Sequence, residues 1–443
     1  MVSALTNALA QVHSLLPFSD GGLYTQLSAA IQSPRLEAAR SSLRGVFSQR
    51  LPHVVAAALT VKIVNITLAG RQLRRQDQRL DSKPFGLVVD PSNVCMLGCP
   101  GCVHSSTAPG VFDWPNATLP ETRWSALLQA CGAFAVGVYF CDYGEPLLNR
   151  ATPKMIREAK TYLLSTSLST SLSVPRFDAE AYVESGLDSL VASIDGATEG
   201  VYGRFRRKGS LELALQNMRA LAEAKRRLRR RTPAISWNFL AFEHNAHEIP
   251  AARALARRAG ANYFRVVKPF DVTWDDPEIV PAAAVPTGVE RLDWTSVSHA
   301  PENWNPCSKD VKEDAFAAAL AAPLPDLPPP SGPASHACRW LYQNLVMDAT
   351  GRILPCCGAP TTDGKLVFAQ WDGSGADAWN SERYRQARGF FSGHGAGDVH
   401  CSRCDWDQTT VNIGPEEIRR YFRAAAPGLF DRRSLGLLAA CAA

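Results

Sequence analysis

The sequence lacks a strong excess of charge of either sign. Its 443 residues include 47 lysines and arginines and 42 aspartates and glutamates, and only 20% of residues are charged. Proteins whose main partner is nucleic acid usually concentrate basic charge on one face or stripe. The one dense basic run, "KRRLRRR" at 225–231, has no aromatic residues between its arginines. We therefore predict the exposed end of a helix there, and no nucleic-acid partner.

The sequence also lacks a long uninterrupted apolar run and an N-terminal secretory signal. No window reaches the ~18 apolar residues that a membrane-spanning helix needs. The first residues, "MVSALTNALAQVHSLLPF", have neither the basic start nor the long apolar stretch of a signal peptide. We therefore expect a cytoplasmic protein with no membrane partner. Disulfides are rare in that compartment, so the twelve cysteines indicate metal binding or catalysis.

No internal repeat of fixed period is present, and the chain divides by pattern instead. Residues 1–82 show helical spacing of apolar residues and predict a helical N-terminal segment. From 83 to 272, short apolar runs such as "VGVYFC" and "LVASID" alternate with helical stretches in some six units. Buried parallel strands have such continuous apolar runs, so this region predicts an α/β fold built on a parallel sheet.

The rest of the chain predicts a connector and a small cysteine-bearing domain. Residues 273–337 are rich in proline, aspartate and alanine and are interpreted as a connector. The stretch "CRWLYQNLVMDATGRILPCC" then predicts two short strands across an "ATGR" turn, within a domain at 338–410. Residues 411–443 are interpreted as a helical tail.

Three cysteines, Cys95, Cys99 and Cys102, follow the first predicted strand of the α/β region. Chemistry in such folds lies at the carboxyl ends of the parallel strands. Three thiolates can bind three irons of a 4Fe-4S cube and leave the fourth iron open to another ligand. The alternatives are three separate core cysteines or a zinc site completed by His104. Glycines 98 and 101 allow the loop to bend, as wrapping a cube requires.

These cysteines and three later segments resemble the radical S-adenosylmethionine (radical SAM) enzymes, whose cluster motif is C-x3-C-x2-C. The segments "YGEPLLN" (143–149), "STSLS" (169–173) and "SIDGATEGVYGRFRRKG" (193–209) are similar to family segments on the second, third and fourth strands. The resemblance implies a partial (β/α)6 barrel that binds a 4Fe-4S cluster and S-adenosylmethionine. It implies cofactor contacts by Glu145, which would pair with the cofactor's ammonium, and by Ser169, Thr170, Ser193 and Arg206.

One position departs from the family pattern. Gly101 stands where most relatives have an aromatic residue that packs on adenine. The adenine contact must then come from elsewhere, and the segment "FRVVKP", around Val266 and Val267, is the expected source. Asn238 and Glu243 could contact cofactor or substrate, or could equally be cap or surface groups.

A second cysteine group resembles an auxiliary-cluster domain, called SPASM or, in its shortened form, twitch. The resemblance assigns Cys338, Cys356, Cys401 and Cys404 to one closed auxiliary 4Fe-4S cluster. A full SPASM domain carries further cysteines soon after the C-x2-C pair, and "DWDQTTVNIGPEEIRRYF" has none, so the twitch form is favoured. Cys357 could replace Cys356, and a structural zinc is the alternative metal.

The resemblance implies that an external one-electron donor, such as flavodoxin or ferredoxin, drives cleavage of S-adenosylmethionine to a 5′-deoxyadenosyl radical. Three alternatives for what the protein does stay open. The substrate radical could be oxidised by the auxiliary cluster, in a dehydrogenation or bond formation, which we favour. It could instead be requenched by a thiol in an epimerase, for which Cys307 is the expected hydrogen donor. A non-catalytic iron–sulfur scaffold is the third.

The N-terminal segment bears on the class of substrate. Peptide-modifying relatives often carry a leader-binding domain of mixed helices and strands, whereas residues 1–82 show helical pattern only. This favours a small-molecule substrate such as a sugar, an aminocyclitol or another biosynthetic intermediate. Modification of a ribosomally made peptide is the alternative. The N-terminal segment is also too short for a complete cobalamin-binding domain.

Overall fold

The computed structural model describes residues 53–102, 104, 115–269, 276–285, 287–292, 338–356, 366–373, 377–391 and 421. Within these residues the strands form one sheet in the order β10-β9-β8-β1-β2-β3-β4-β5-β6-β7. The strands are β1 Gly86–Val89, β2 Gly137–Phe140, β3 Ser165–Thr170, β4 Ser189–Ser193, β5 Ala234–Leu240, β6 Tyr263–Val267, β7 Gly288–Arg291, β8 Asn344–Met347, β9 Arg352–Leu354 and β10 Ala369–Gln370.

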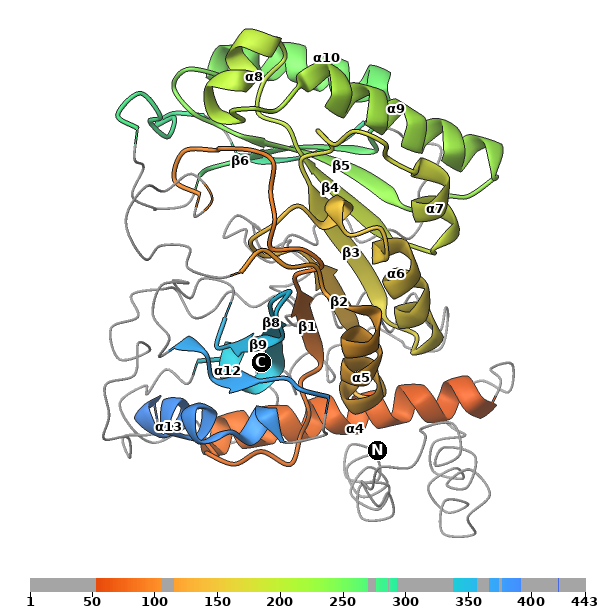
Figure 1. The fold of residues 1–443 in the computed structure, drawn as a ribbon, viewed down its shortest axis with the longest axis vertical. Helices are drawn as coiled ribbons and strands as arrows, with labels where there is room; N and C mark the ends of the chain where they lie inside the picture. The colour runs from red at the N-terminus through yellow and green to blue at the C-terminus, as the bar shows by residue number, and fades with distance from the viewer. Residues whose placement is uncertain are drawn as a thin grey trace, which may run out of the picture.

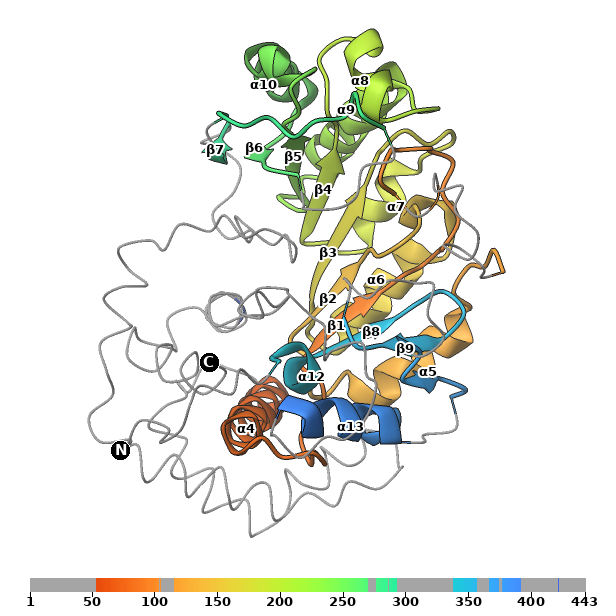
Figure 2. The same ribbon diagram turned by 90° about the vertical axis from the view of Figure 1, so that its left-hand side faces the viewer.

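Strands β1 to β6 pair in parallel in chain order, each with the next. Helices connect them: α5 Glu121–Cys131, α6 Thr152–Thr161, α7 Ala179–Glu184, α8 Glu199–Phe205, α9 Leu211–Arg227 and α10 Ile249–Ala259, with short 3-10 turns η1 Pro146–Leu148 and η2 Ala246–Glu248. The sheet curves, with these helices along its outer side and β1 to β6 forming an open arc (Figures 1 and 2). The predicted α/β fold with an unclosed, barrel-like sheet is confirmed.

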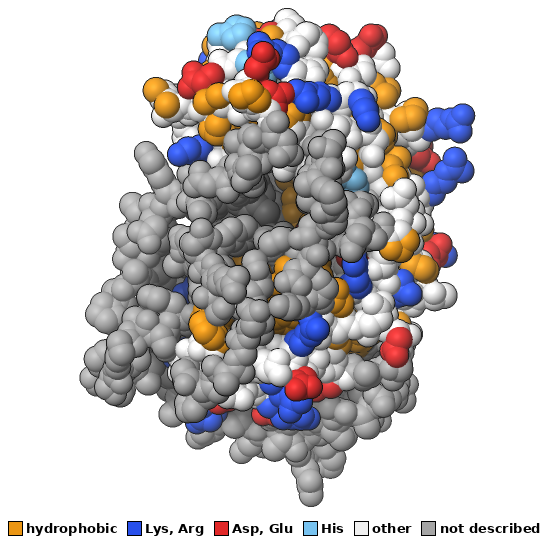
Figure 3. Space-filling model, turned by 60° about the vertical axis from the view of Figure 1, so that its left-hand side comes forward, with side chains coloured by type: hydrophobic (Ala, Val, Ile, Leu, Met, Phe, Trp, Pro, Cys, Tyr) orange, Lys and Arg blue, Asp and Glu red, His pale blue; other side chains and the backbone are white. Residues whose placement is uncertain are grey.

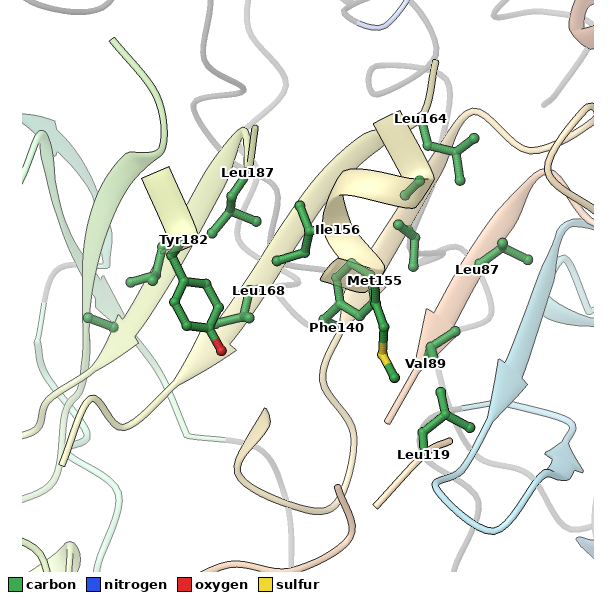
Figure 4. Close-up of a cluster of buried hydrophobic side chains, with 14 of the residues drawn as sticks. Leu87, Val89, Leu119, Phe140, Met155, Ile156, Leu164, Leu168, Tyr182 and Leu187 are labelled. Carbon is green, nitrogen blue, oxygen red and sulfur yellow. The ribbon is translucent and has the colours of Figure 1, made fainter. Parts of the chain in front are cut away.

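The outer face of the sheet forms the main hydrophobic core. Alternate residues of each strand face the helices, because successive side chains of a strand point to opposite faces. Met155 and Ile156 of α6 lie in one buried cluster with Phe140 of β2 and Leu168 of β3 (Figure 4). Each such fully buried side chain contributes about 1.5–3 kcal/mol to stability. This packing fixes the curvature of the sheet and therefore the position of its carboxyl ends.

The inner face of the sheet is different, because small hydroxyl side chains replace large apolar ones there. In β3, β4 and β5 the positions that alternate with the core residues are largely serines. They are Ser165, Ser167, Ser169, Ser189, Ser193 and Ser236. Ser189 donates a hydrogen bond to Ser167 across neighbouring strands, with 2.7 Å between the two Oγ atoms. The concave side of the arc therefore carries small side chains and many hydrogen-bonding groups.

Helix α9 agrees with the interpretation of the basic run as a helix end, although Lys225 itself is buried and donates a hydrogen bond to Asn262 Oδ1 at 3.1 Å. Ser210 caps its first turn, accepting a hydrogen bond from the Leu213 N–H, and Lys225, Arg226 and Arg227 occupy its last turn. Cations at a helix C-terminus are favourable because the helix dipole is negative there. Basic and acidic side chains are also interspersed on the face of the molecule that Figure 3 shows.

The described residues from 338 to 391 are joined to the barrel more closely than their sequence suggests. Strand β8 pairs in parallel with β1, so that Leu87 lies beside Leu345, and β9 and β10 extend the sheet in antiparallel fashion. Helix α12 Trp340–Gln343 precedes β8, while η4 Ala378–Asn380 and α13 Glu382–Phe391 follow β10. The two predicted strands around "ATGR" are present as β8 and β9, but they belong to the same sheet as the barrel.

Two further elements lie at the N-terminal end of the described chain and at one edge of the sheet. Helix α4 His53–Arg75 agrees with the helical pattern of the N-terminal segment and runs across the base of the molecule beside α13 (Figure 1). Strand β7 lies inside the predicted connector 273–337 and pairs antiparallel with β6, forming an edge of the sheet. No helix among the described residues is long and apolar enough to span a membrane.

Candidate functional site

The loop after β1 brings the three predicted cluster cysteines into one cluster of buried side chains, called the cysteine pocket below. Cys95, Cys99 and Cys102 pack with Leu97, Phe205, Phe242 and Ile279, with Cys99 only 8% exposed. The Cys102 N–H donates to the Cys99 carbonyl at 3.1 Å, and Gly101 between them has a φ of +74°. That backbone conformation favours glycine, which explains why an aromatic residue does not fit here without strain.

The donor set of this pocket fits a 4Fe-4S cube. Burial raises the pKa of Cys95 to about 12, and burial likewise raises the pKa of Cys99. Such thiols need a metal to become thiolates, and soft thiolate ligands select iron–sulfur clusters. In a cube each thiolate binds a different iron, so the three sulfur atoms need not converge. Among the described residues, no three His, Cys, Asp or Glu side chains converge on one metal-sized point.

Arg206 lies against this pocket, at the end of α8. Its Nε donates to Asp195 Oδ2 at 2.5 Å, and its Nη1 is 3.8 Å from Cys99 Sγ. Asp195 is completely buried and also accepts a hydrogen bond from the Leu240 N–H at 2.6 Å. The carboxylate therefore orients the guanidinium, which brings a positive charge to the cysteine loop. A site for anionic groups, whether thiolates or a carboxylate, follows from that arrangement.

Glu145 is buried at the start of η1 and is fixed by four donors. Its carboxylate accepts hydrogen bonds from the N–H groups of Leu147 (3.2 Å) and Ser171 (2.9 Å), and from the hydroxyls of Thr170 (2.5 Å) and Ser171 (2.8 Å). Burial raises the pKa of Glu145, while these bonds oppose the rise. The two hydroxyls can rotate towards other acceptors, so an arriving cation can replace them while the two backbone donors hold the carboxylate in place.

Gly144 couples Glu145 to the cysteine loop. A Cβ atom at this position would overlap the Ser92 carbonyl, so only glycine allows the two backbones to approach. The Glu145 N–H then donates to the Val94 carbonyl at 2.8 Å, one residue before Cys95. The Gly-Glu pair is thus the physical link between the end of β2 and the cluster loop.

The other predicted cofactor residues lie along the carboxyl ends of the strands. Ser169 and Ser193 are half-buried on the inner face, and Thr170 is buried against Glu145. Val267 is 3% exposed and pairs with Leu240, which packs on the cysteine pocket. Val266 faces the outer core instead, so it is removed from the expected adenine contact.

The two residues left open by the sequence are now distinguished. Glu243 is exposed and accepts a hydrogen bond from the Ala283 N–H at 3.0 Å, as a surface loop residue does. Asn238 lies on the inner face beside Ser193, is 7% exposed, and its Oδ1 has no hydrogen-bond partner. Asn238 therefore lies with the polar residues of the inner face, and Glu243 lies on the surface.

Part of the auxiliary site can be placed. Cys338, before α12, and Cys356, after β9, are both half-buried. The predicted ligands Cys401 and Cys404, the alternative ligand Cys357 and the predicted hydrogen donor Cys307 lie outside the described residues. Cys131 is in the core, as its sequence context indicates, whereas Cys141 follows β2 and is only half-buried.

Sequence reasoning missed three residues that hold this site together: Gly144, Ser171 and Asp195. Each stands inside or beside a segment that the resemblance had singled out. Ser171 makes two of the four hydrogen bonds to Glu145, and Asp195 orients Arg206. The signal was present in the segments "STSLS" and "SIDG", but the spacing alone did not tell which polar residue binds which.

Comparison with known protein families gives two matches. Residues 89–232 match the model of the radical SAM superfamily, and residues 338–405 match that of SPASM, an iron-sulfur cluster-binding domain. The first match contains the cysteine loop, Glu145 and Arg206. The second contains Cys338, Cys356, Cys401 and Cys404.

Similar proteins were also found by sequence and by structure. The chain is 26% identical to PqqA peptide cyclase of Methylobacterium nodulans over 315 residues, which cover 69% of this chain and 76% of that protein. It is 25% identical to PqqA peptide cyclase of Xanthomonas campestris pv. campestris over 313 residues, with the same coverage.

Two solved structures are similar at low identity. Streptococcus suis SuiB bound to the precursor peptide SuiA has 14% identity and a TM-score of 0.47, covering 85% of this chain and 82% of that one. BtrN in complex with AdoMet and 2-DOIA has 12% identity and a TM-score of 0.42, covering 75% of this chain and 99% of that one.

Proposed function

Because the chain is a radical SAM enzyme with a SPASM domain, and binds 4Fe-4S clusters and S-adenosylmethionine, we propose that it oxidises a ribosomally made peptide, forming a new bond within it. The observation that carries the proposal is the similarity to curated relatives named PqqA peptide cyclase, across 69% of this chain. The product would be two hydrogens lighter than the substrate.

The expectation of a small-molecule substrate is wrong. It rested on the purely helical pattern of residues 1–82, and the relatives whose names specify a peptide overturn it. The physical reason is that the pattern of one segment describes how that segment folds, and a peptide can be bound by other parts of a chain. Of this segment, the structure describes only residues 53–82.

When bound, the cofactors supply the redox chemistry: one-electron cleavage of S-adenosylmethionine, abstraction of a hydrogen atom, and acceptance of a second electron by the auxiliary cluster. The chain's own residues bind and orient. Cys95, Cys99 and Cys102 would hold the first cluster, with Arg206 beside them. Glu145 would hold the cofactor's ammonium, positioned by Thr170 and Ser171.

The inner face of the sheet supports a peptide as the substrate. The small serine side chains along β3, β4 and β5 leave space above the concave face and provide it with both hydrogen-bond donors and acceptors. A peptide main chain offers N–H and C=O groups that such hydroxyls can pair. A purely apolar substrate would offer these hydroxyls no partner, at a cost of about 1–3 kcal/mol for each one left without a hydrogen bond.

The test uses a candidate peptide substrate, made as a synthetic copy of any short open reading frame found beside the gene of this protein. Anaerobically reconstituted protein, S-adenosylmethionine and a chemical reductant should convert that peptide to a product two hydrogens lighter, with fragmentation interrupted between the joined residues. One 5′-deoxyadenosine should form per product. Formation of 5′-deoxyadenosine with an unchanged peptide would refute the proposal.

Solvent deuterium separates bond formation from epimerisation. An oxidised product should carry no carbon-bound deuterium, and Cys307→Ala should leave its yield unchanged. An epimerised peptide would keep its mass in ordinary water and gain carbon-bound deuterium in heavy water. Loss of that product in the Cys307→Ala variant, with continued formation of 5′-deoxyadenosine, would assign the thiol as hydrogen donor and replace the oxidative proposal.

A further inference from the structure

A short segment of the predicted connector covers one side of the cysteine pocket. We call residues 276–283 the strap. Ile279, near the middle of the strap, is 3% exposed and packs in the cysteine pocket, the cluster that contains Cys99 and Phe242. The residues on either side of it are exposed, Val280 to 47%. The strap therefore lies at the surface and inserts one large apolar side chain among the residues that surround the cysteines.

Two ion pairs fasten the first half of the strap to the end of α8. Arg204 Nη2, in the last turn of α8, is 3.3 Å from Glu278 Oε2, and the Arg207 guanidinium pairs with Asp276. The Arg207 carbonyl also accepts a hydrogen bond from the Gly98 N–H at 2.9 Å, so this residue joins the cysteine loop to the strap. The two arginine side chains are 48% and 49% exposed, and water and salt therefore reach both pairs.

The second half of the strap is held by its backbone instead. The Glu243 N–H donates to the Val280 carbonyl at 2.8 Å, and the Ala282 N–H donates to the Ala241 carbonyl at 3.0 Å. These bonds form an antiparallel bridge to the chain that follows β5. Exposed ion pairs contribute little to stability and are screened by salt, whereas backbone hydrogen bonds between uncharged groups are not. The strap thus has one firm end and one end that detaches more easily.

Iron and sulfide need a path to the cysteines, of which Cys99 is only 8% exposed. We propose that the strap is a hinged cover of the cysteine pocket, which opens at its ion-paired end to admit iron and sulfide and closes over the assembled cluster. Opening withdraws Ile279 from the pocket, and each thiol releases its proton to water as it binds iron. The inference goes beyond the proposed function, because it does not depend on which substrate the protein takes.

The experiment measures how fast the cluster loses iron. Anaerobically reconstituted full-length protein is mixed with a reductant and an excess of a ferrous chelator, whose colour reports the iron released. The phase that belongs to this cluster is the one missing when Cys95, Cys99 and Cys102 are replaced by alanine. Salt screens the ion pairs, so raising its concentration from about 0.05 M to about 1 M should accelerate this phase about threefold or more.

Substitutions separate the ion pairs from a general effect of charge. Arg204→Gln and Glu278→Gln break the same pair but change the net charge in opposite directions, and each should accelerate iron release about twofold or more. Arg204→Gln combined with Arg207→Gln should also remove most of the salt dependence. Arg253→Gln is the matched control, because it removes a pair of similar exposure, to Glu290, between α10 and β7. It should leave iron release unchanged.

Ile279→Ala tests the inserted side chain. The N–H groups of Glu278 and Ile279 both donate to Asp276, within the end of the strap that should detach. Hydrogen exchange of the reconstituted protein, followed by mass spectrometry, should show these amides exchanging about tenfold or more faster in the variant, because less apolar surface opposes opening. Peptides from β3 and β4 should keep their exchange rates. Should Ile279→Ala not fold, the Arg204→Gln, Arg207→Gln protein decides in the same measurement, with an expected acceleration of about threefold or more.

Four results would overturn the inference. They are iron release and hydrogen exchange that no strap variant changes, opposite effects of Arg204→Gln and Glu278→Gln, an equal acceleration in Arg253→Gln, and a parallel rise of exchange in β3 and β4. The second would assign the effect to charge alone, and the last to unfolding of the whole barrel. None of them bears on the peptide product, so the proposed function stands or falls separately.

Discussion

At the scale of single residues, Glu145 is the most informative position of the site. Its four donors fix the carboxylate at a position that is almost fully buried. Glu145→Gln should weaken S-adenosylmethionine binding by about 1.5–3 kcal/mol, which is about 10- to 150-fold, because a charge-assisted bond to the ammonium is lost. Equilibrium binding to the reconstituted protein measures this.

The control for this variant is Glu243→Gln, the same change at an exposed glutamate that lies outside the site. It should retain most of the cofactor affinity and the full iron content. An unchanged affinity in Glu145→Gln, with iron content intact, would take Glu145 out of the cofactor site.

The glycines around the cluster loop give a second residue-scale prediction. Gly144→Ala should prevent the cluster from assembling, because the added Cβ would overlap the Ser92 carbonyl and separate Glu145 from the loop. Gly98→Ala is the matched control, since the nearest atom to its added Cβ is Lys208 Cε at 3.6 Å, an ordinary contact. Iron content and the thermal midpoint of unfolding measure both. Equal iron in the two variants would contradict the close approach seen here.

At the scale of elements, a buried lysine joins α4 to the end of α5. Lys62 Nζ donates to the carbonyls of Gly132, at 3.0 Å, and Ala135. Burial lowers the pKa of Lys62 from its ordinary 10.5 to about 7. Between these two pH values the unfolded lysine holds a proton that the folded one has released. Stability should therefore rise as pH increases from about 7 to about 10.5.

Lys62→Met tests this by denaturant unfolding at several pH values. Methionine cannot titrate, so the rise of stability across that pH window should become smaller by an amount of order a few kcal/mol. Lys154→Met, at a lysine side chain that is 69% exposed, should leave the pH dependence as it is. A rise of equal size in the Lys62→Met protein would mean that other groups cause it.

Elements also show what sequence patterns can and cannot predict. The short apolar runs predicted β1 to β6 correctly, because the run of apolar residues that marks a buried strand can be found in the local sequence. The pairing of β8 with β1 depends on contacts between residues 344–347 and 86–89, which no local pattern encodes. The same holds in the site, where motifs indicated Glu145 and Arg206 but not their partners Ser171 and Asp195. Strand β7, with a half-exposed "GVER" sequence, carries no apolar run to detect.

At the scale of the whole molecule, the two cluster regions share one sheet. The reconstituted protein should hold about eight irons in two clusters, and replacing Cys95, Cys99 and Cys102 by alanine should leave about four. Cys338→Ala with Cys356→Ala should likewise remove only the auxiliary four. Iron and sulfide analysis measure these numbers. A count near four in the unaltered protein, with zinc present, would make the second site structural.

Truncation should behave differently from cysteine replacement. A chain ending at residue 337 loses β8. The edge of β1 is then unpaired, and the buried β1 side chains Leu87 and Val89 lie at that edge. Unpaired apolar edges aggregate. We therefore expect the truncated chain to lose both clusters and its solubility, although it keeps all three N-terminal cysteines. A soluble truncated protein with about four irons would show that the barrel folds alone.

The pairing of β1 with β8 also determines when this part of the sheet can form during synthesis of the chain. Strand β1 leaves the ribosome early, yet its neighbour on one side is made some two hundred and fifty residues later, after every other parallel strand of the barrel. At about 5–20 residues per second that interval lasts roughly 13–50 seconds. For that time the nascent barrel carries an open strand edge, so we expect the edge to be shielded, or the cluster to be loaded late, once β8 has paired with β1.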